Sequence, residues 1–322
     1  MSRIFVIAVF CGGIFLASLM SLYYGAGANN GVARVIIPDG ASLSLVGRVL
    51  KRAGIVHKAP LFIGAGRVFG YGTRIRAGEY DIPAFATMAD VFIILRKGEV
   101  VHHPLTIAEG LTSAQIMQVL SQNELLVVPD ESENAIPAEG SLLPETYYIT
   151  RGTLRGQLVE RMQKAQAQTL ATLWAGRQKD LPIKSPYEAL ILASIIEKET
   201  GQVRERNHIA AVFHNRLRRN MRLQSDPTII YGLTAGRGLE IGLGRPILRR
   251  EIEKHTPYNT YRIDGLPPTP IANVGRAALL ATLHPSSSRA LYFVADGAGG
   301  HRFAQTLAEH NANVRAYRKT QQ

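Results

Sequence analysis

The sequence contains two long uncharged runs, and each of them predicts a helix of a different kind. Residues 4–24 form an uncharged run of 21 residues, which is long enough to cross a bilayer as a helix. Residues 189–196 also lack charge, but they lie between Ser185, a good N-cap, and Gly201, a typical helix end. This second run predicts a short helix that is buried on most of its circumference. Pro186 suits its first turn, and Glu188 is expected to complete a capping box with Ser185.

The segment between these two runs alternates short strand patterns with amphipathic helices. Strands are predicted at 35–37, 78–82 and 100–107, and the helices that follow them at 42–54, 87–98 and 112–120. Ser42 and Thr87 are N-cap residues, and Gly54 and Gly98 end the first two helices. Repeated strand–helix units of this length predict small α+β packing.

The remaining segments predict helices joined by polar loops. We expect a loop at 129–141, a long amphipathic helix at 153–174, a second helix at 203–219 and a hairpin-like turn at 221–231. A β-hairpin is expected around 292–300, before a capping box formed by Thr306 and Glu309. The arginines of the 203–219 helix are interpreted as its solvated face: Arg204, Arg206, Arg216, Arg218 and Arg219.

Length and pattern together predict an α+β protein with one N-terminal transmembrane helix. The 322 residues favour about two domains. We divide them into a cytoplasmic tip (1–3), a transmembrane helix (4–24), a flexible Gly/Ala/Asn linker (25–33), a small α+β module (34–107) and a mixed α+β catalytic domain (108–322).

Charge indicates both the orientation and the kind of partner. The net charge of +12 favours anionic partners. Arg3 precedes the apolar run, so the amino terminus is expected in the cytoplasm and the body on the exported side. A cleaved signal peptide ending near Ala26-Gly27-Ala28 is the alternative, but the run is longer than a usual signal h-region. Cys11, the only cysteine, lies inside the run and leaves no disulfide to form.

The buried helix ends in two carboxylates, Glu197 and Glu199. Residues two apart on a helix point in different directions, so we expect one of them to be inside. Glu197 continues the line of Ala189 and Ala193, whose small side chains leave room for a ligand. Burial and the negative end of the helix dipole both favour a protonated carboxyl. The sequence therefore predicts Glu197 as a general acid.

Five motifs after and including this helix resemble the endolytic murein transglycosylase family. They are Ala193-Ser194-Ile195-Ile196-Glu197-Lys198-Glu199-Thr200, Arg222-Leu223-Gln224-Ser225-Asp226-Pro227-Thr228, Tyr258-Asn259-Thr260-Tyr261, Gly265-Leu266-Pro267-Pro268 and Tyr292-Phe293-Val294-Ala295-Asp296-Gly297. The resemblance implies a lysin-motif-like fold for the module 34–107, with Glu197 as catalytic residue. It also implies substrate-binding roles for Gln224, Ser225, Asp226, Thr228, Tyr258, Asn259 and Tyr261, and supporting roles for Glu199 and Glu145.

The resemblance further implies a reaction and a location. A single carboxyl would cleave the MurNAc-β-1,4-GlcNAc bond of nascent glycan strands without water, leave a 1,6-anhydro-MurNAc end and so terminate strand elongation. No cofactor or metal is expected. The partners implied are peptidoglycan strands, the lipid bilayer and peptidoglycan synthases, in a single-pass protein of the bacterial inner membrane with its body in the periplasm.

Three other interpretations are weaker. Lys198 could hold pyridoxal phosphate, but residues 296–300 lie in a predicted hairpin and not in a phosphate-binding strand-to-helix turn. His102 and His103 are adjacent strand residues that point to opposite faces, which makes a poor metal site. Nucleic-acid binding is disfavoured because the arginines lack interleaved aromatic residues. A non-catalytic, membrane-tethered glycan-binding scaffold remains the alternative to an enzyme.

Overall fold

The computed structural model describes residues 2–71, 75–129, 135–234 and 245–320. They belong to two compact units, of which the first comprises Met1–Pro104 with Tyr148–Thr153 and the second Leu105–Tyr147 with Leu154–Gln322. The architecture is mixed α+β, with one N-terminal helix that is long and apolar enough to cross a membrane. The domain limits predicted at 34–107 and 108–322 remain predictions.

The first unit combines a two-stranded antiparallel sheet with three short helices. Its elements follow in the order β1 (Ala33–Ile37), α2 (Leu43–Arg52), α3 (Ala59–Val68), β2 (Gly78–Ile82) and α4 (Met88–Lys97). Strand β1 pairs with β2 so that Val35 lies opposite Tyr80. Ser42 and Thr87 cap α2 and α4 as predicted, whereas the sequence pattern did not predict α3. The helices close over a core that includes Val46, Leu50, Phe62, Tyr80 and Phe92.

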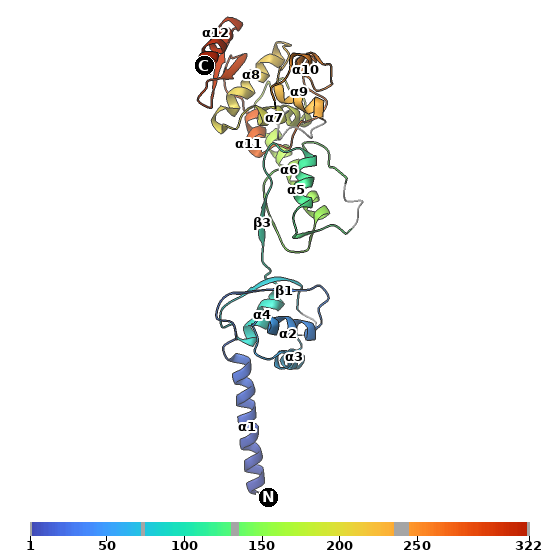
Figure 1. Cartoon of the computed structure of the whole chain (residues 1–322), viewed down its shortest axis with the longest axis vertical. Helices are drawn as coiled ribbons and strands as arrows, with labels where there is room; N and C mark the ends of the chain where they lie inside the picture. The colour runs from blue at the N-terminus through green and yellow to red at the C-terminus, as the bar shows by residue number, and fades with distance from the viewer. Residues whose placement is uncertain (1, 72–74, 130–134, 235–244, 321–322) are drawn as a thin grey trace. The chain divides into compact units, whose positions relative to one another are not determined.

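Helix α1 (Ser2–Tyr24) leads directly into this unit (Figure 1). Its segment from Phe5 to Tyr24 has 20 residues and no charged side chain, and little of it is buried against protein. The residues after it, predicted to be a flexible linker, are hydrogen-bonded to the unit. The Gly27 N–H donates to the Phe85 carbonyl at 3.1 Å, and the Ala28 N–H to the Ile55 carbonyl at 3.2 Å.

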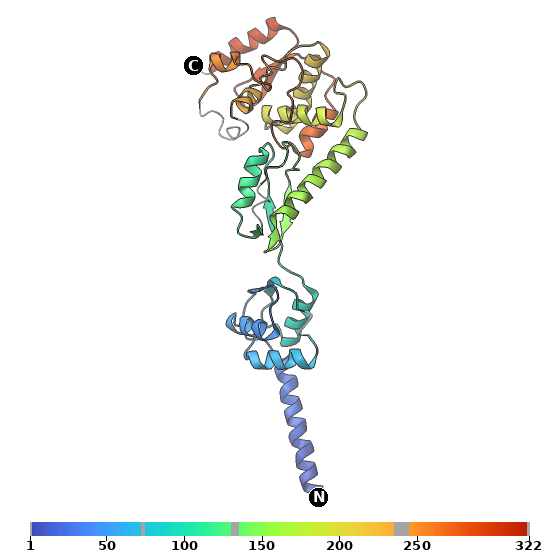
Figure 2. The ribbon, with the colours of Figure 1, turned by 90° about the vertical axis from the view of Figure 1, so that its right-hand side faces the viewer.

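Four short strands and two helices follow along the chain. Strand β3 (His103–Thr106) pairs with β5 (Thr146–Ile149), and β4 (Leu126–Val127) with β6 (Thr153–Leu154). Helix α5 (Ser113–Ser121) starts at Thr112, which forms a capping box with Gln115. Helix α6 (Arg155–Ala175) is one long, unbroken helix, drawn in light green in Figure 2.

Helix α7 (Pro186–Glu199) is the core of the second unit. It contacts α8 (Arg206–Arg218), α9 (Asp226–Thr234) and α11 (Arg276–Leu283), and α8 follows the short 3₁₀ turn η2 (Val203–Glu205) (Figure 1). Every residue from Ala189 to Glu197 is buried, which confirms the burial predicted from the uncharged run. The unit continues through α10 (Arg249–Glu253), the hairpin β7 (Tyr292–Ala295) and β8 (His301–Ala304), and α12 (Leu307–Thr320).

Two local predictions in this unit are wrong. The hairpin-like turn predicted at 221–231 is a loop followed by α9, which begins at Asp226 with Pro227 in its first turn. An acidic residue and a proline are both favourable at a helix start, so this segment can begin a helix. Its many polar residues had suggested a turn instead. Glu188 does not complete a capping box with Ser185. Its carboxylate instead accepts a hydrogen bond from the Lys184 N–H at 2.6 Å.

Candidate active site

Glu197 lies in a closed ion-pair network. Its side chain is 3% exposed, and its Oε1 accepts a hydrogen bond from Arg206 Nη2 at 2.9 Å. Its Oε2 accepts one from the Gly275 N–H at 3.0 Å, and Arg206 also contacts Glu109 Oε2 at 3.3 Å. Burial raises the pKa of Glu197, and Arg206 and the Gly275 N–H partly offset that rise. Both carboxylate oxygens are therefore already engaged by donors.

Glu199 has different surroundings, although it stands only two residues further along α7. Its Oε1 accepts a hydrogen bond from the Ser225 hydroxyl at 2.5 Å. Burial raises the pKa of Glu199 to about 7; the Ser225 hydrogen bond opposes the rise, and the negative charge of Asp226 adds to it. A carboxyl with a pKa near neutrality can both donate and accept a proton at neutral pH.

Glu199 also opens into a cavity of about 470 Å³, which Glu197 does not line. The cavity walls combine charged groups, amides and aromatic rings. Its lining residues are Glu199, Arg216, Gln224, Asp226, Tyr261, Tyr292, Phe293, Leu307, His310 and Asn311. Rings beside hydrogen-bonding groups fit sugars, which present apolar C–H faces ringed by hydroxyls.

Four of the predicted binding residues gather around Glu199. Ser225 binds its carboxyl directly, while Gln224, Asp226 and Tyr261 line the cavity. Tyr261 donates its hydroxyl proton to Asp226 Oδ1 at 2.7 Å, which links the two loops that carry them.

The loop that carries Gln224 and Ser225 is held by the backbone and side chain of Thr260. Gln224 has a φ of +51°, a conformation that residues other than glycine rarely adopt. The Gln224 N–H donates to the Thr260 carbonyl at 3.1 Å, and the Ser225 N–H donates to the Thr260 hydroxyl at 2.9 Å. These hydrogen bonds hold Gln224 in this energetically unfavourable backbone conformation, which places the Ser225 hydroxyl next to Glu199.

The other predicted residues serve the scaffold around the cavity. Thr228 is fully buried and donates to the Ser225 carbonyl at 2.6 Å. Asn259 is 1% exposed, and its amide donates to the carbonyls of Ile252 at 3.0 Å and Lys254 at 2.6 Å. Tyr258 hydrogen-bonds Thr269 at 2.9 Å and does not line the cavity. These three residues stabilise the loops that carry the site.

Glu145 lies away from Glu199. It is exposed and lines a separate cavity of about 530 Å³ with Glu109, Thr169 and Arg276. Its backbone carbonyl accepts a hydrogen bond from the Ile107 N–H at 3.0 Å. Among the described residues, the structure therefore does not bring Glu145 together with the cavity of Glu199.

Two arginines interpreted as solvated surface are buried, and this part of the prediction is wrong. Arg206 is 6% exposed and pairs with Glu197. Arg216 is 7% exposed; its guanidinium donates to the carbonyls of Leu291 at 2.7 Å and Leu223 at 2.8 Å, and it lies over the Tyr292 ring. Helical periodicity does not distinguish these two arginines from their exposed neighbours, because their partners come from distant segments.

The C-terminal hairpin and helix supply the residues that sequence reasoning did not assign. Tyr292 and Phe293 of β7 and His310 of α12 line the cavity, and the His310 ring stacks on Tyr292 at 5.1 Å. The signal available for β7 was the motif 292–297, from which no site role was drawn.

In the part of the chain that the structure describes, no group of three or more His, Cys, Asp or Glu side chains could hold a metal ion. His103 is instead paired with Glu79, with 2.7 Å between Nε2 and Oε2. Lys198 donates to the Gly110 carbonyl at 3.2 Å.

The second unit thus has mixed α+β architecture and places a buried carboxyl, at the end of a core helix, beside a polar and aromatic cavity. The chain belongs to the YceG-like family, whose model matches residues 35–316.

Curated relatives of this chain carry one common name. This chain is 28% identical over 335 residues to the endolytic murein transglycosylase of Bacillus subtilis. The alignment covers 95% of this chain and 90% of that protein. This chain is 30% identical over 319 residues to the protein of the same name from Streptococcus pneumoniae, covering 86% of this chain. This chain spans 57% of the pneumococcal protein's length.

A solved structure has a related fold. The crystal structure of a YceG-like protein from Listeria monocytogenes matches with a TM-score of 0.53 and 29% sequence identity. The match covers 88% of this chain and 99% of that one.

Proposed function

We propose that this chain is a lytic transglycosylase that acts on peptidoglycan, with Glu199 as its general acid. The relatives named endolytic murein transglycosylase support the reaction class. The observation that carries the assignment is the Glu199 carboxyl, which has a pKa of about 7 and faces the polar, aromatic cavity.

Glu199 replaces Glu197, which the sequence pattern favoured, for a geometric reason. Proton donation to a glycosidic oxygen requires a carboxyl that can reach substrate. Glu199 lines the cavity, whereas both oxygens of Glu197 are held by Arg206 and the Gly275 N–H. Glu197 is assigned instead to fixing Arg206 and the chain around Gly275.

The chemistry proposed for Glu199 has two steps. The protonated carboxyl first donates its proton to the oxygen of the MurNAc-β-1,4-GlcNAc bond as the C1–O bond breaks. The resulting carboxylate then removes the proton from the C6 hydroxyl of the same MurNAc, whose oxygen bonds to C1 and closes a 1,6-anhydro ring. The enzyme regains its proton, and no water is consumed. A pKa near 7 suits a group that acts first as acid and then as base.

The cavity residues have roles that follow from their chemistry. Ser225 orients the Glu199 carboxyl, and Tyr261 and Tyr292 offer rings and hydroxyls to a sugar. Asp226 lines the same cavity, so it is the second carboxyl that a hydrolase would use. The Tyr261 hydroxyl is bound to Asp226 Oδ1, which occupies one of its two oxygens.

The proposal extends to the location of the enzyme. Helix α1 is proposed to anchor it in the bacterial inner membrane as a single-pass protein, with the amino terminus in the cytoplasm and the body in the periplasm. An anchored enzyme reaches only glycan near the membrane, which fits a role as terminator of strand elongation beside peptidoglycan synthases. The β–α–α–β order of β1, α2, α3 and β2 supports a lysin-motif-like module that holds the strand.

Product analysis in ¹⁸O-labelled water tests the reaction class. The full-length protein is incubated with uncrosslinked peptidoglycan, and the fragments are identified by mass spectrometry. We expect 1,6-anhydro ends, lighter by one water than reducing ends and free of ¹⁸O. Reducing ends that carry ¹⁸O would contradict the proposal and point to hydrolysis through Asp226.

A further inference from the structure

An apolar groove runs between α3 and the C-terminal half of α1, within the first unit. Its volume is about 460 Å³. Almost all of its lining is apolar: Leu16, Leu19, Met20, Leu22, Tyr23, Tyr24, Pro60, Leu61, Gly64, Ala65, Val68, Phe69 and Met88. Val68 is 80% exposed and Phe69 is 51% exposed. Helix α3 therefore presents large apolar side chains where a water-facing helix would carry polar ones.

The groove's position relative to a bilayer follows from α1. The apolar segment Phe5–Tyr24 has 20 residues, so it extends for ~30 Å, about the thickness of the hydrocarbon core. Leu16, Leu19 and Met20 belong to the later turns of this segment and also line the groove. If α1 spans the membrane, α3 lies beside turns that are within or just at the edge of the hydrocarbon.

The connection between α1 and the rest of the unit is short and bonded. Tyr23, in the last turn of α1, packs at a tilt against Phe69 with ring centres 5.0 Å apart, and it stacks on Phe92 at 6.5 Å. The Gly25 N–H donates to the Ser21 carbonyl at 2.8 Å, and Gly27 is bonded to Phe85. This connection fixes α3 against α1.

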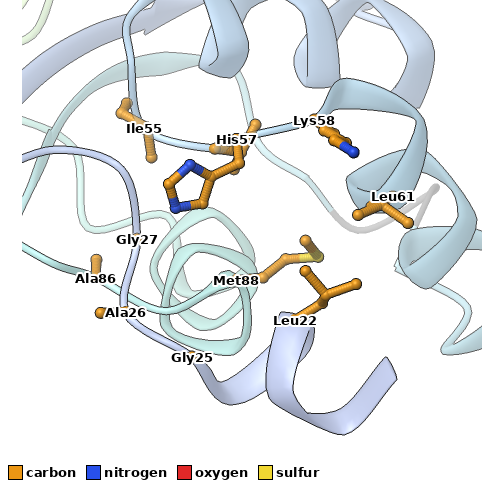
Figure 3. Close-up of a pocket in the computed structure, with 11 residues that line it drawn as sticks. Leu22, Gly25, Ala26, Gly27, Ile55, His57, Lys58, Leu61, Ala86 and Met88 are labelled. Carbon is orange, nitrogen blue, oxygen red and sulfur yellow. The ribbon is translucent and has the colours of Figure 1, made fainter. Parts of the chain in front are cut away.

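A lysine and a histidine lie at one end of the groove. A small adjoining cavity shares Leu22, Leu61 and Met88 with the groove and is also lined by His57 and Lys58. Figure 3 shows His57 and Lys58 on the segment that enters α3, opposite Leu22 and Met88. Apolar surface flanked by a cation matches the acyl chain and phosphate of a phospholipid.

We propose that the groove is an interfacial binding site for an anionic phospholipid, and that α3 docks the first unit on the bilayer surface. The acyl chain lies along α3 between Leu61 and Val68, and the phosphate faces Lys58. The inference rests on the proposed membrane anchor, because only an embedded α1 brings the groove to lipid. Docking through α3 adds a second attachment to the one that α1 provides.

Spin labels at single cysteines in the full-length protein test this proposal. In a Cys11→Ala background, labels are placed at Val68 in α3, at Ile36, which is exposed on β1, and at Leu16 in α1. The protein is reconstituted in phosphatidylcholine vesicles containing phosphatidylglycerol. We expect the ratio of oxygen to nickel-complex accessibility to be several-fold higher at Val68 than at Ile36.

Three outcomes would overturn the proposal, and they are distinguishable. If the Val68 label is as accessible to the nickel complex as the Ile36 label while the Leu16 label is in hydrocarbon, the docking site is refuted and the membrane anchor is retained. A Leu16 label in water removes the anchor and the docking site together. A Val68 label protected from both reagents shows that protein, from a second copy or another partner, occupies the groove.

The headgroup contact has its own test. In the wild type, we expect the ratio of oxygen to nickel-complex accessibility at Val68 to rise when phosphatidylglycerol is added to the vesicles. Lys58→Glu should lower this ratio and abolish its rise. The matched control is Lys51→Glu, an exposed lysine of α2 that lines neither cavity and should change nothing. An unchanged phosphatidylglycerol effect in Lys58→Glu would contradict the assigned phosphate contact.

Discussion

Glu197 and Glu199 stand two residues apart on α7, in two regions of the molecule that differ in kind. Glu197 faces Arg206 and the Gly275 N–H, so each of its oxygens has a donor. Glu199 has the Ser225 hydroxyl and a cavity lined by Asp226, Tyr261 and Tyr292. Under the proposed assignment of Glu199, burial alone does not define a general acid. The carboxyl must also face space where a substrate can bind.

The largest expected difference is in catalysis. Glu199→Gln should lower activity on uncrosslinked peptidoglycan by about 10²–10⁴-fold, the usual contribution of general acid–base catalysis. Glu197→Gln, assayed at equal concentration of folded protein, should keep activity within about tenfold because its carboxyl does not line the cavity. Release of soluble fragments measures both variants. Equal losses in the two variants would contradict the assignment.

The next effect is on stability, and it belongs to the Glu197 region. Arg206→Ala leaves the buried Glu197 carboxylate without its cation and should lower the free energy of unfolding by about 3–5 kcal/mol. Arg204→Ala is the matched control, since Arg204 is an exposed neighbour. Chemical denaturation measures the change. A loss below about 1 kcal/mol would show that the pair contributes no more than a surface ion pair.

The contribution of Glu199 to stability is expected to depend on pH, which further distinguishes the surroundings of Glu199 from those of Glu197. Because the folded-state pKa of Glu199 is about 7, above the ordinary value of 4.5, the folded protein binds more protons than the unfolded chain between these values. The contribution of Glu199 to stability is therefore highest below pH 4.5 and falls by up to about 3 kcal/mol as pH rises to 7. Relative to wild type, Glu199→Gln should gain stability across this window. If the free energies of unfolding of wild type and Glu199→Gln changed with pH in parallel, this result would contradict the raised pKa.

The smallest expected effect comes from the hydroxyl that binds Glu199. The Ser225 hydrogen bond lowers the pKa of Glu199, so Ser225→Ala should raise it. The alkaline limb of the pH–rate profile should then move to higher pH. Thr228→Ser is a matched control, because it keeps the hydroxyl that supports the same loop. An alkaline limb that moves to lower pH would contradict the assigned bond.

Local pattern predicted much of the fold because capping residues and apolar periodicity act over short distances. Ser42, Thr87 and Ser185 cap the helices that were expected from them. Helix α3 was missed because its sequence is rich in glycine and carries an early proline, which gives no clear stripe. Its apolar face is the one that we propose contacts lipid.

The choice between the two glutamates could not be made from periodicity. Helix α7 is enclosed by α8, α9 and α11, so more than one of its faces is inside and both carboxyls are partly or fully buried. What separates them comes from far along the chain: Gly275 for Glu197 and Ser225 for Glu199. Gln224 and Asp226 of the motif at 222–228 line the cavity, and their roles in binding substrate stay predictions, whereas the local fold predicted for this motif was wrong.

The most direct measurement is infrared difference spectroscopy of the Glu199 carboxyl as a function of pH. A protonated carboxyl has a C=O stretch that a carboxylate lacks, so its intensity follows protonation. We expect a band that titrates near pH 7 in wild type, persists in Glu197→Gln and disappears in Glu199→Gln. Loss of the band in Glu197→Gln instead, or no carboxyl titrating near neutral pH, would contradict the claim that Glu199 is the acid.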